Sequence, residues 1–506
     1  MARETAQTDL TDHRGSPLNS QMNDAQAVPK PAHRSPWLLP VLFAPVFMVL
    51  LDVFIVNVTA PSLRADLGAS DSDLQWVVAA YLLTYALSLI TGGRLGDVFG
   101  RRRMFKYGIA GFTIASALCA AAPSPSALIV ARLLQGFGGA AMWPQVLSII
   151  QVEFSPPERP KALGFQGLVQ GLAAISGQIV GGGLIALDVL GLGWRSVFLI
   201  NIPVGLIALL SADRLIPESR SETARRLDLV GVALATLTLS LVMIPAVEGR
   251  ELGWPAWTFA CFAVAPLAAT LFVAAERRIT ARGGSPLVEL RLFETRGFRI
   301  GLLSATSLYF AISFFFLLGI YLQEGLGLSP LESGLAFTPI AVAFVTASLT
   351  GPRLSDGVRE YLPQIGAALA AVGLITTIFA VQATGNGSVS AWLLLAMVPF
   401  GAGMGTAIPP LIHLVLRAVP TADAGAASGT LVTAQQIGNA LGVAIVGTVF
   451  FSELGSATSA GSFGDAFTVA MAVQTAFALT AAALVSRARR TSTERVPAGM
   501  PAGEGA

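Results

Sequence analysis

Long apolar segments follow one another along almost the whole chain, and this repetition constrains the fold more than any other feature of the sequence. A helix needs about 20 mainly apolar residues to cross a bilayer. Fourteen windows meet that condition: 38–60, 74–93, 107–122, 126–150, 162–187, 196–212, 229–247, 256–275, 300–322, 333–352, 364–382, 390–412, 427–450 and 466–485. Only 12% of the residues are charged, against about 25% in soluble domains. The sequence therefore predicts an all-α integral membrane protein.

The basic residues predict which side of the membrane each loop faces, because cytoplasmic loops carry an excess of Lys and Arg. With the N-terminus in the cytoplasm, all but four of the 32 Lys and Arg residues lie in cytoplasmic segments or at their membrane edges. Arg64, Arg195 and Arg250 fall outside, and Arg132 falls within a span. An even number of spans returns the chain to the same side. We therefore expect both termini in the cytoplasm.

A short internal repeat predicts how the spans are grouped. GGRLGD at 92–97 recurs as GPRLSD at 351–356, and each copy directly follows a span, the second and the tenth. Parallel repeats of this kind build transporters from two related halves. We expect two six-helix bundles with two extra central helices. The predicted segments are a disordered cytoplasmic tail (1–36), an N-terminal bundle (37–213), a two-helix insert with its flanking loops (214–297), a C-terminal bundle (298–487) and a second disordered tail (488–506).

Two charged residues lie in the middle of the predicted spans, Asp52 in the first and Arg132 in the fourth. An ionised side chain inside the bilayer is costly unless it has a partner, so a functional role is the default interpretation. The other acids fall in tails, loops or span ends. The alternatives are that Asp52 is only a hydrogen-bonding packing residue and that Arg132 extends to an interface.

The loop after the second span carries Gly93, Asp97, Gly100, Arg101 and Arg102 at close spacing. Glycines allow a tight turn between two helices. A carboxylate here can accept hydrogen bonds from the N–H groups at a helix start, and the arginines can face lipid headgroups and neighbouring carboxylates. Without the spacing, the arginines alone would indicate only an ordinary cytoplasmic loop.

The fifth span places glycines four residues apart, at Gly167 and Gly171 and again at Gly177 and Gly181. This spacing leaves one helix face without side chains, so that a second helix can approach closely. Helix packing alone would explain the pattern, whatever the function.

These motifs, in their order along the chain, resemble the major facilitator superfamily and within it the fourteen-span drug:proton antiporters. Gln178 stands where the antiporter motif of the fifth helix usually has a proline, so the kink of a proline is absent. The resemblance covers residues 38–485 and rests on Leu51-Asp52 with Asn57 and Pro61, the Gly93–Arg103 loop, Arg132-x-x-x-Gly136, the Gly-rich fifth span, and Trp194-Arg195 with Phe198, Asn201 and Pro203.

The resemblance implies the major facilitator fold and export of a small organic compound in exchange for protons. It also implies that Asp97 latches the two halves and that Arg132 takes part in proton transfer. Since antiport needs an intramembrane group that gains and loses a proton, our hypothesis is that Asp52 carries the proton and Arg132 modulates it. The antiporter motif maps onto Gly171, Gly177, Gln178 and Gly181.

Amide and aromatic side chains in the central spans predict an amphipathic cavity for bulky, apolar or singly charged molecules. The expected substrate is a drug or antibiotic, exported across a bacterial cell membrane, with protons and membrane lipid as the other partners. A facilitator of one metabolite on the same fold is the alternative. We expect no enzyme activity, cofactor, metal site or nucleic-acid partner, since no catalytic set or metal-ligand spacing is present. The predicted cavity residues are Asn57, Gln145, Gln170, Tyr309, Phe315, Gln435 and Asn439.

Overall fold

The computed structural model describes residues 35–493 apart from 156–157, 221–226, 385–389, 421–423 and 457–458. The predicted N-terminal tail falls outside these residues except for 35–36, and residues 488–493 of the predicted C-terminal tail instead form the end of a helix, Ala460–Thr493. The side chains of some helical residues, Gln170 and Gly171 among them, also lie outside the described part. Every regular element in the described ranges is a helix, as the sequence predicts.

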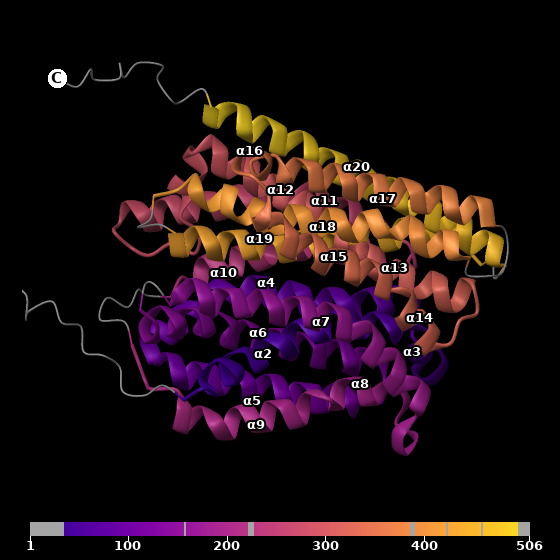
Figure 1. The fold of residues 1–506 in the computed structure, drawn as a ribbon, viewed down its shortest axis with the longest axis horizontal. Coiled ribbons are helices and arrows are strands. Elements are labelled where there is room, and N and C mark those ends of the chain that lie inside the picture. The colour runs from indigo at the N-terminus through magenta and orange to yellow at the C-terminus, as the bar shows by residue number, and fades with distance from the viewer. Residues whose placement is uncertain are drawn as a thin grey trace, which may run out of the picture.

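The first group of helices, which we call the N-bundle, is drawn in indigo to magenta in Figure 1. Its α4 packs against α5 and α6, and α2 packs against α6, α7 and α9. The elements are α2 (Leu38–Ile55), η1 (Val56–Val58), α3 (Ala60–Leu67), α4 (Asp71–Phe99), α5 (Arg101–Ala120), α6 (Pro125–Glu153), α7 (Arg159–Leu187), η2 (Val189–Gly191), η3 (Gly193–Arg195), α8 (Ser196–Leu199) and α9 (Asn201–Leu215).

The second group, the C-bundle, forms the orange and yellow layer above it (Figure 1). The helix predicted at 300–322 is not regular: it passes through a 3₁₀ turn and ends in a π turn, irregularities that are frequent at functional sites. The elements are α12 (Arg296–Phe310), η5 (Ala311–Ser313), α13 (Phe314–Ile320), η6 (Tyr321–Gly325), α14 (Pro330–Ala336), α15 (Thr338–Thr350), η7 (Gly351–Arg353), α16 (Asp356–Arg359), α17 (Leu362–Thr384), α18 (Ala391–Arg417), α19 (Ala424–Leu454) and α20 (Ala460–Thr493).

Two helices between the bundles, α10 (Leu229–Glu248) and α11 (Ala256–Ala281), form the pair that we call the insert. They pack against each other, and α10 also contacts α4 of the N-bundle and α19 of the C-bundle. The apolar stretch of α11 is only 17% buried, as expected for a helix that faces lipid. A short helix, η4 (Leu290–Glu294), leads from the insert into α12.

Eleven helical segments in the described residues are long and apolar enough to cross a membrane. The other three predicted spans correspond to α5, α6 and α7, which have 20, 29 and 29 residues. Helix α5 begins with Arg101, Arg102 and Arg103, which lower its mean hydropathy. The structure thus shows a multi-pass helical membrane protein, and the exact number of fourteen spans stays a prediction.

The helices run between two ends of the molecule, which we name after residues. The Arg64 end carries η1, α3, the start of α4 and the η6–α14 turn; the Asp97 end carries the turn between α4 and α5. The two bundles meet closely at the Arg64 end. A Cβ on Gly319 would lie 2.6 Å from the carbonyl oxygen of Asn57, so only glycine fits at this contact. Gln323 also donates to the Val58 carbonyl across the interface at 3.2 Å. The Arg64 end is therefore closed.

Candidate functional site

Asp52 lies inside the N-bundle, where three helices surround its carboxylate. Both Asp52 and Arg132 have no exposed surface, and the Arg132 guanidinium donates from Nη1 to Asp52 Oδ2. Oδ1 accepts from Gln135 Nε2 at 2.8 Å and from Asn201 Nδ2 at 3.4 Å. Helix α2 thus supplies the acid, α6 supplies Arg132 and Gln135, and α9 supplies Asn201. The structure places the two predicted proton-coupling residues in one buried ion pair.

The Arg132 guanidinium is held from several sides. Its Nε donates to the Val77 carbonyl of α4 at 2.8 Å, and Nη1 also donates to Gln135 Oε1 at 2.7 Å. The Tyr81 ring lies 4.3 Å from the guanidinium carbon, within range of a cation–π interaction. Its Nη2 is buried without a hydrogen-bond partner among the described residues. A buried ion pair of this kind is tolerated because each charge is also hydrogen-bonded, and the loss of either partner leaves a costly lone charge.

Sequence reasoning did not find the rest of this network. Ser116 of α5 accepts from Gln135 at 2.9 Å and from Asn201 at 3.3 Å, and all three side chains are buried. Gln135 follows Arg132 by three residues, so both lie on one face of α6. This spacing could have predicted that Gln135 belongs to the same polar network as Arg132. No sequence pattern indicates that Asn201 or Ser116 lies on the facing side of its helix.

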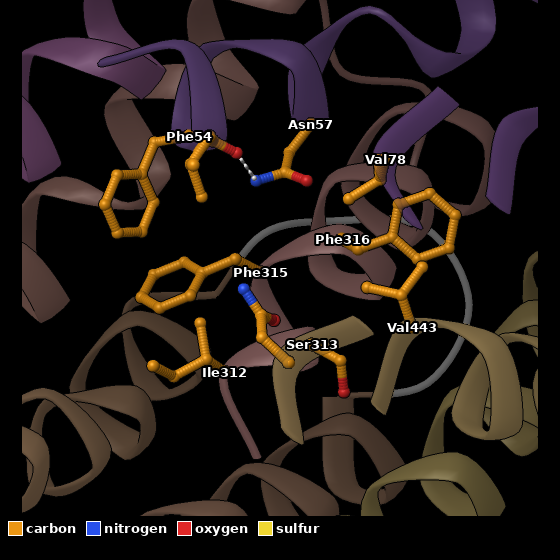
Figure 2. A pocket seen from close by; sticks show the side chains of 10 residues that line it. Phe54, Asn57, Val78, Ile312, Ser313, Phe315, Phe316 and Val443 are labelled. Atoms are coloured by element: carbon orange, nitrogen blue, oxygen red, sulfur yellow. Dashed lines mark hydrogen bonds between the residues drawn. The ribbon is translucent and has the colours of Figure 1, made fainter. Parts of the chain in front are cut away.

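A pocket lies between the bundles, one helix face away from Asp52. Figure 2 shows Phe54, Asn57 and Val78 of the N-bundle facing Ile312, Phe315 and Val443 of the C-bundle. The space inside the pocket that a water-sized molecule can reach is only about 10 Å³, far below the roughly 300–1,000 Å³ of typical small-molecule sites. In this conformation it is therefore too small to enclose a drug-sized molecule. Its ten lining residues are Val53, Phe54, Asn57, Val78, Ile312, Ser313, Phe315, Phe316, Asn439 and Val443.

The predicted cavity residues divide into three groups. Asn57, Phe315 and Asn439 line the pocket, whereas Tyr309 and Gln435 lie on α12 and α19 and do not line it. Gln170 has a side chain outside the described part.

Gln145 requires a correction, because its amide is engaged between α4 and α6 rather than turned to the pocket. It donates to the Gly92 carbonyl at 2.8 Å and to the Ala141 carbonyl at 3.1 Å. The tight packing explains this position: a Cβ on Gly96 would overlap the Gln145 side chain. Gln145 is thus a packing residue of the N-bundle, and polarity alone could not distinguish it from a cavity residue.

The turn at the Asp97 end differs in one respect from the expectation. Gly100 has φ 107°, a conformation that favours glycine, and α5 begins directly after it. The carboxylate at this helix start belongs to Glu218, which accepts from the backbone N–H of Arg102 at 3.1 Å and of Arg103 at 3.3 Å. Asp97 does not cap α5.

Asp97 instead accepts from the Arg101 guanidinium at 3.1 Å, because α4 continues to Phe99 and keeps Asp97 within its last turn. Gly93, on the same helix, packs beside Pro144 of α6 in ordinary contact. The hydrogen bonds of this turn thus join α4, the start of α5 and the loop that follows α9.

Gly177 and Gly181 of α7 pack closely on α2 and η1, a close helix approach of the kind that their spacing predicts. A Cβ on Gly177 would lie 2.7 Å from Phe54 Cβ, and one on Gly181 would lie 2.6 Å from Ile55 Cγ1. Gln178, the departure from the usual proline, is 1% exposed, and neither atom of its side-chain amide has a hydrogen-bond partner among the described residues. Helix α7 is unbroken from Arg159 to Leu187, in agreement with the absence of a proline kink.

Charged side chains also gather at the Arg64 end. Arg195 and the Trp194 indole both donate to Asp66 Oδ2, the indole at 2.9 Å. These hydrogen bonds, that of Arg195 first, lower the pKa of the Asp66 carboxyl below its ordinary value. Arg64 bonds Asp71 at 2.8 Å and Glu324 of the C-bundle at 3.2 Å, so one guanidinium joins the two bundles.

Comparison with known proteins gives relatives over most of the chain. The chain is 41% identical over 440 residues to the "Probable actinorhodin transporter" of Streptomyces coelicolor, covering 86% of this chain and 76% of that protein. It is 36% identical over 429 residues to the "Puromycin resistance protein pur8" of Streptomyces alboniger, covering 84% of each.

The fold also matches solved structures. A bacterial homolog of the human lysosomal transporter Spinster, in an inward-facing and unoccupied conformation, superposes with a TM-score of 0.63 at 19% identity, over 91% of this chain and 99% of that one. At this identity the match concerns the fold alone. The family model described as Major Facilitator Superfamily matches residues 42–443. The chain belongs to the major facilitator superfamily.

Proposed function

We propose that the protein exports an amphipathic drug or antibiotic across the bacterial cell membrane in exchange for protons, and so confers resistance. The observation that carries this proposal is the buried Asp52–Arg132 pair next to a pocket between the two bundles. Relatives named as antibiotic transporters and resistance proteins support export rather than uptake. The position of a buried, ion-paired acid behind the pocket supports coupling to protons.

The proton site and the pocket share two helix backbones. Asp52 faces the buried network while the next residue, Val53, lines the pocket. Arg132 holds the Val77 carbonyl while the next residue, Val78, lines the pocket. A proton on Asp52 neutralises the counterion of Arg132, so the arginine must find new partners, and α2 and α4 move with it. In this way protonation changes the shape of the pocket without touching the substrate.

We also propose that the Asp97 end faces the cytoplasm. The basic residues at that end include Arg101, Arg102, Arg103 and Lys106 at the start of α5, as the positive-inside rule requires. The helices α5, α6 and α7 complete a set of fourteen spans, since each of them has 20 or more residues. The bundles and insert then correspond to 37–213, 298–487 and 214–297.

The pocket lining indicates the class of substrate. Phe54 and Phe315 meet edge to face with ring centroids 5.5 Å apart, and the Asn57 amide lies beside them. Phenyl rings and neutral amides suit a planar apolar molecule with a few hydrogen-bonding groups. Because the pocket is small while the Arg64 end is closed, the bundles must separate before such a molecule can bind fully. A facilitator of one metabolite is the second candidate, because the apolar and amide side chains that line the pocket do not select a single class of substrate.

Drug accumulation in a bacterial host without its own pumps tests the function. Cells that express the protein should accumulate less ethidium or puromycin than control cells, and an uncoupler should abolish the difference. The Arg195→Gln protein, changed in an ion pair remote from the pocket, should export as well as the wild type. If no compound of a broad panel shows uncoupler-sensitive efflux, export is the wrong function. Facilitated movement of a metabolite that persists with an uncoupler would favour the second candidate.

A further inference from the structure

The end of α10 and the turn between α10 and α11 give the insert polar contacts with both bundles at the Arg64 end. This turn is compact: the Trp254 N–H donates to the Gly249 carbonyl at 2.6 Å, and that of Gly253 donates to the Arg250 carbonyl at 3.1 Å. It directs Glu248, Arg250 and Glu251 toward the first turns of α4. The three side chains are thus presented on one rigid element.

Glu251 binds the N-terminus of α4. Its Oε1 accepts from the Ser72 backbone N–H at 2.7 Å and its Oε2 accepts from the Ser72 hydroxyl at 2.9 Å. A carboxylate is favourable at a helix start because the free N–H groups and the helix dipole are positive there. Glu248 accepts from the Trp76 indole one turn further along α4, at 2.5 Å. The insert is therefore fixed firmly to the N-bundle.

A chain of ion pairs continues from the insert to the C-bundle. Arg250 pairs with Asp71, Asp71 pairs with Arg64, and Arg64 pairs with Glu324. The side chains of Arg250, Asp71 and Glu324 are only 22%, 19% and 18% exposed, so solvent screens these pairs less than fully exposed ones. The charged groups that face one another here are Arg64, Asp71, Asp73, Glu248, Arg250, Glu251 and Glu324.

The insert also touches the C-bundle directly. The Thr448 hydroxyl of α19 donates to the Ala246 carbonyl of α10 at 2.5 Å. The Phe451 ring of α19 lies 5.8 Å from the Arg250 guanidinium carbon and 6.0 Å from that of Arg64. Both arginines that connect the three units therefore also contact the same aromatic ring. Separation of the C-bundle from the N-bundle at this end would break the contact between Arg64 and the Phe451 ring and the Arg64–Glu324 pair together.

We propose that the insert is a clamp that holds the Arg64 end closed, with Arg250 and Glu251 as positioning residues. Glu251 fixes the turn on α4 through Ser72, and Arg250 pairs with Asp71, which in turn orients Arg64 toward Glu324 and Phe451. When the Arg64 end opens, the insert stays bound to α4 and loses its contacts with α19. The inference rests on the proposed export function and orientation, in which this end faces outward and its closure precedes drug loading from the cytoplasm.

A cysteine introduced at a buried position of α14, outside the insert, can report the opening of the Arg64 end. Ser333 of α14 has no exposed surface, and its neighbour Gly334 packs on the Gln178 backbone of α7. A thiol introduced by Ser333→Cys is therefore accessible only when the bundles part. Cys119 is buried, and the half-buried Cys261 is replaced by alanine in every variant. A membrane-impermeant maleimide is then added to intact cells, and the rate of labelling is measured.

Arg250→Gln should raise the labelling rate about fivefold, since partly buried ion pairs are worth up to roughly 1 kcal/mol. Glu251→Gln should raise it by a similar factor, since a carboxylate at a helix start is worth up to about 1 kcal/mol. Arg250→Lys, which keeps the charge, should stay within about twofold of the parent. The control is Arg195→Gln, which breaks an ion pair at the same end but within the N-bundle, and should leave the rate unchanged. The drug concentration for half-maximal efflux should rise in the first two variants, while the amount of folded protein stays constant.

Unchanged labelling in both Arg250→Gln and Glu251→Gln would overturn the clamp, and so would an equal increase in Arg195→Gln. Labelling only when the reagent enters the cytoplasm would overturn the assigned side. Because labelling reports the conformation and not transport, these results stand even if no exported drug is found. Conversely, efflux with unchanged labelling would leave the export function intact and remove the clamp.

Discussion

Replacing both members of the buried ion pair should separate stability from proton coupling. In Asp52→Asn, the remaining oxygen can still accept from Gln135 and Asn201, so those hydrogen bonds survive. The new amide N–H₂ instead faces the Arg132 guanidinium, donor against donor, and the buried cation loses its counterion. Leaving one charge of a buried pair unpaired costs about 3–5 kcal/mol of folding free energy. Arg132→Met should cost a similar amount, because it leaves the Asp52 carboxylate alone.

The double variant Asp52→Asn/Arg132→Met contains neither charge. Burying neutral groups of similar size is often no less stable than burying an ion pair, so it should lie within about 2 kcal/mol of the wild type. The pair would then show an interaction energy of several kcal/mol in the double-mutant cycle. The double variant should nevertheless fail in uncoupler-sensitive efflux, since no group remains that exchanges a proton.

Denaturant unfolding of the purified proteins in detergent gives the four free energies of unfolding, and drug accumulation in cells gives efflux for the same four proteins. Additive destabilisation in the double variant would refute the argument that the two charges stabilise each other. Normal, pH-dependent efflux by the double variant would refute the assignment of Asp52 as the proton carrier.

Three further predictions concern other parts of the molecule. Gly177→Leu should abolish efflux and lower the thermal stability, because its side chain would enter the space of Phe54. Gly183→Leu, where a Cβ would meet only Leu331 Cδ1 at 3.9 Å, is the control, and equal loss in both would count against a specific contact. Glu218→Gln should weaken the turn at Gly100 and lower the maximal efflux rate more than Asp97→Asn does, because Glu218 binds two backbone N–H groups. Limited proteolysis of the loop measures the weakening of the turn, and drug accumulation measures the efflux rate. The pKa of Asp66 is lowered in the folded state, so its contribution to stability is present above its unfolded pKa of about 3.9 and is lost as pH falls through the folded value. The difference in thermal stability between wild type and Arg195→Gln should therefore vanish under strong acid, and a difference that grows on acidification would contradict this.

Periodicity and hydropathy predicted the helices well because membrane spans must satisfy all backbone hydrogen bonds internally, and that requirement is written into about 20 apolar residues at a time. The glycine spacing in α7 predicted a close approach, and the structure shows which helix approaches. Pairing of Asp52 with Arg132 could be expected because only two charged residues lay in mid-span. In each case a large energetic penalty, for an unpaired backbone group, a steric overlap or an unpaired charge in the membrane, allows few alternative arrangements of the chain.

Residue type alone could not show what each polar side chain faces. Gln145 and Asn57 look alike in the sequence, yet Gln145 is engaged by backbone carbonyls between α4 and α6 and Asn57 lines the pocket. Glu218 lies 117 residues after Arg101 in no recognisable pattern, and only the folded chain brings it under the start of α5. The direction of a side chain around a helix depends on tertiary contacts that no local pattern encodes.

Helix α2 shows why this information matters for the mechanism. Asp52 faces the buried network, Val53, Phe54 and Asn57 line the pocket, and Phe54 and Ile55 also contact glycines of α7. Helix α2 thus meets the proposed proton site, the pocket and the glycine contact with α7. A rotation or shift of α2 that follows a change at Asp52 must alter all three, because a helix moves as a rigid body and the glycine contact has no side chains to resist it. Under the proposed function, coupling between proton and drug needs no relay of side chains, since one helix contacts both the buried ion pair and the pocket.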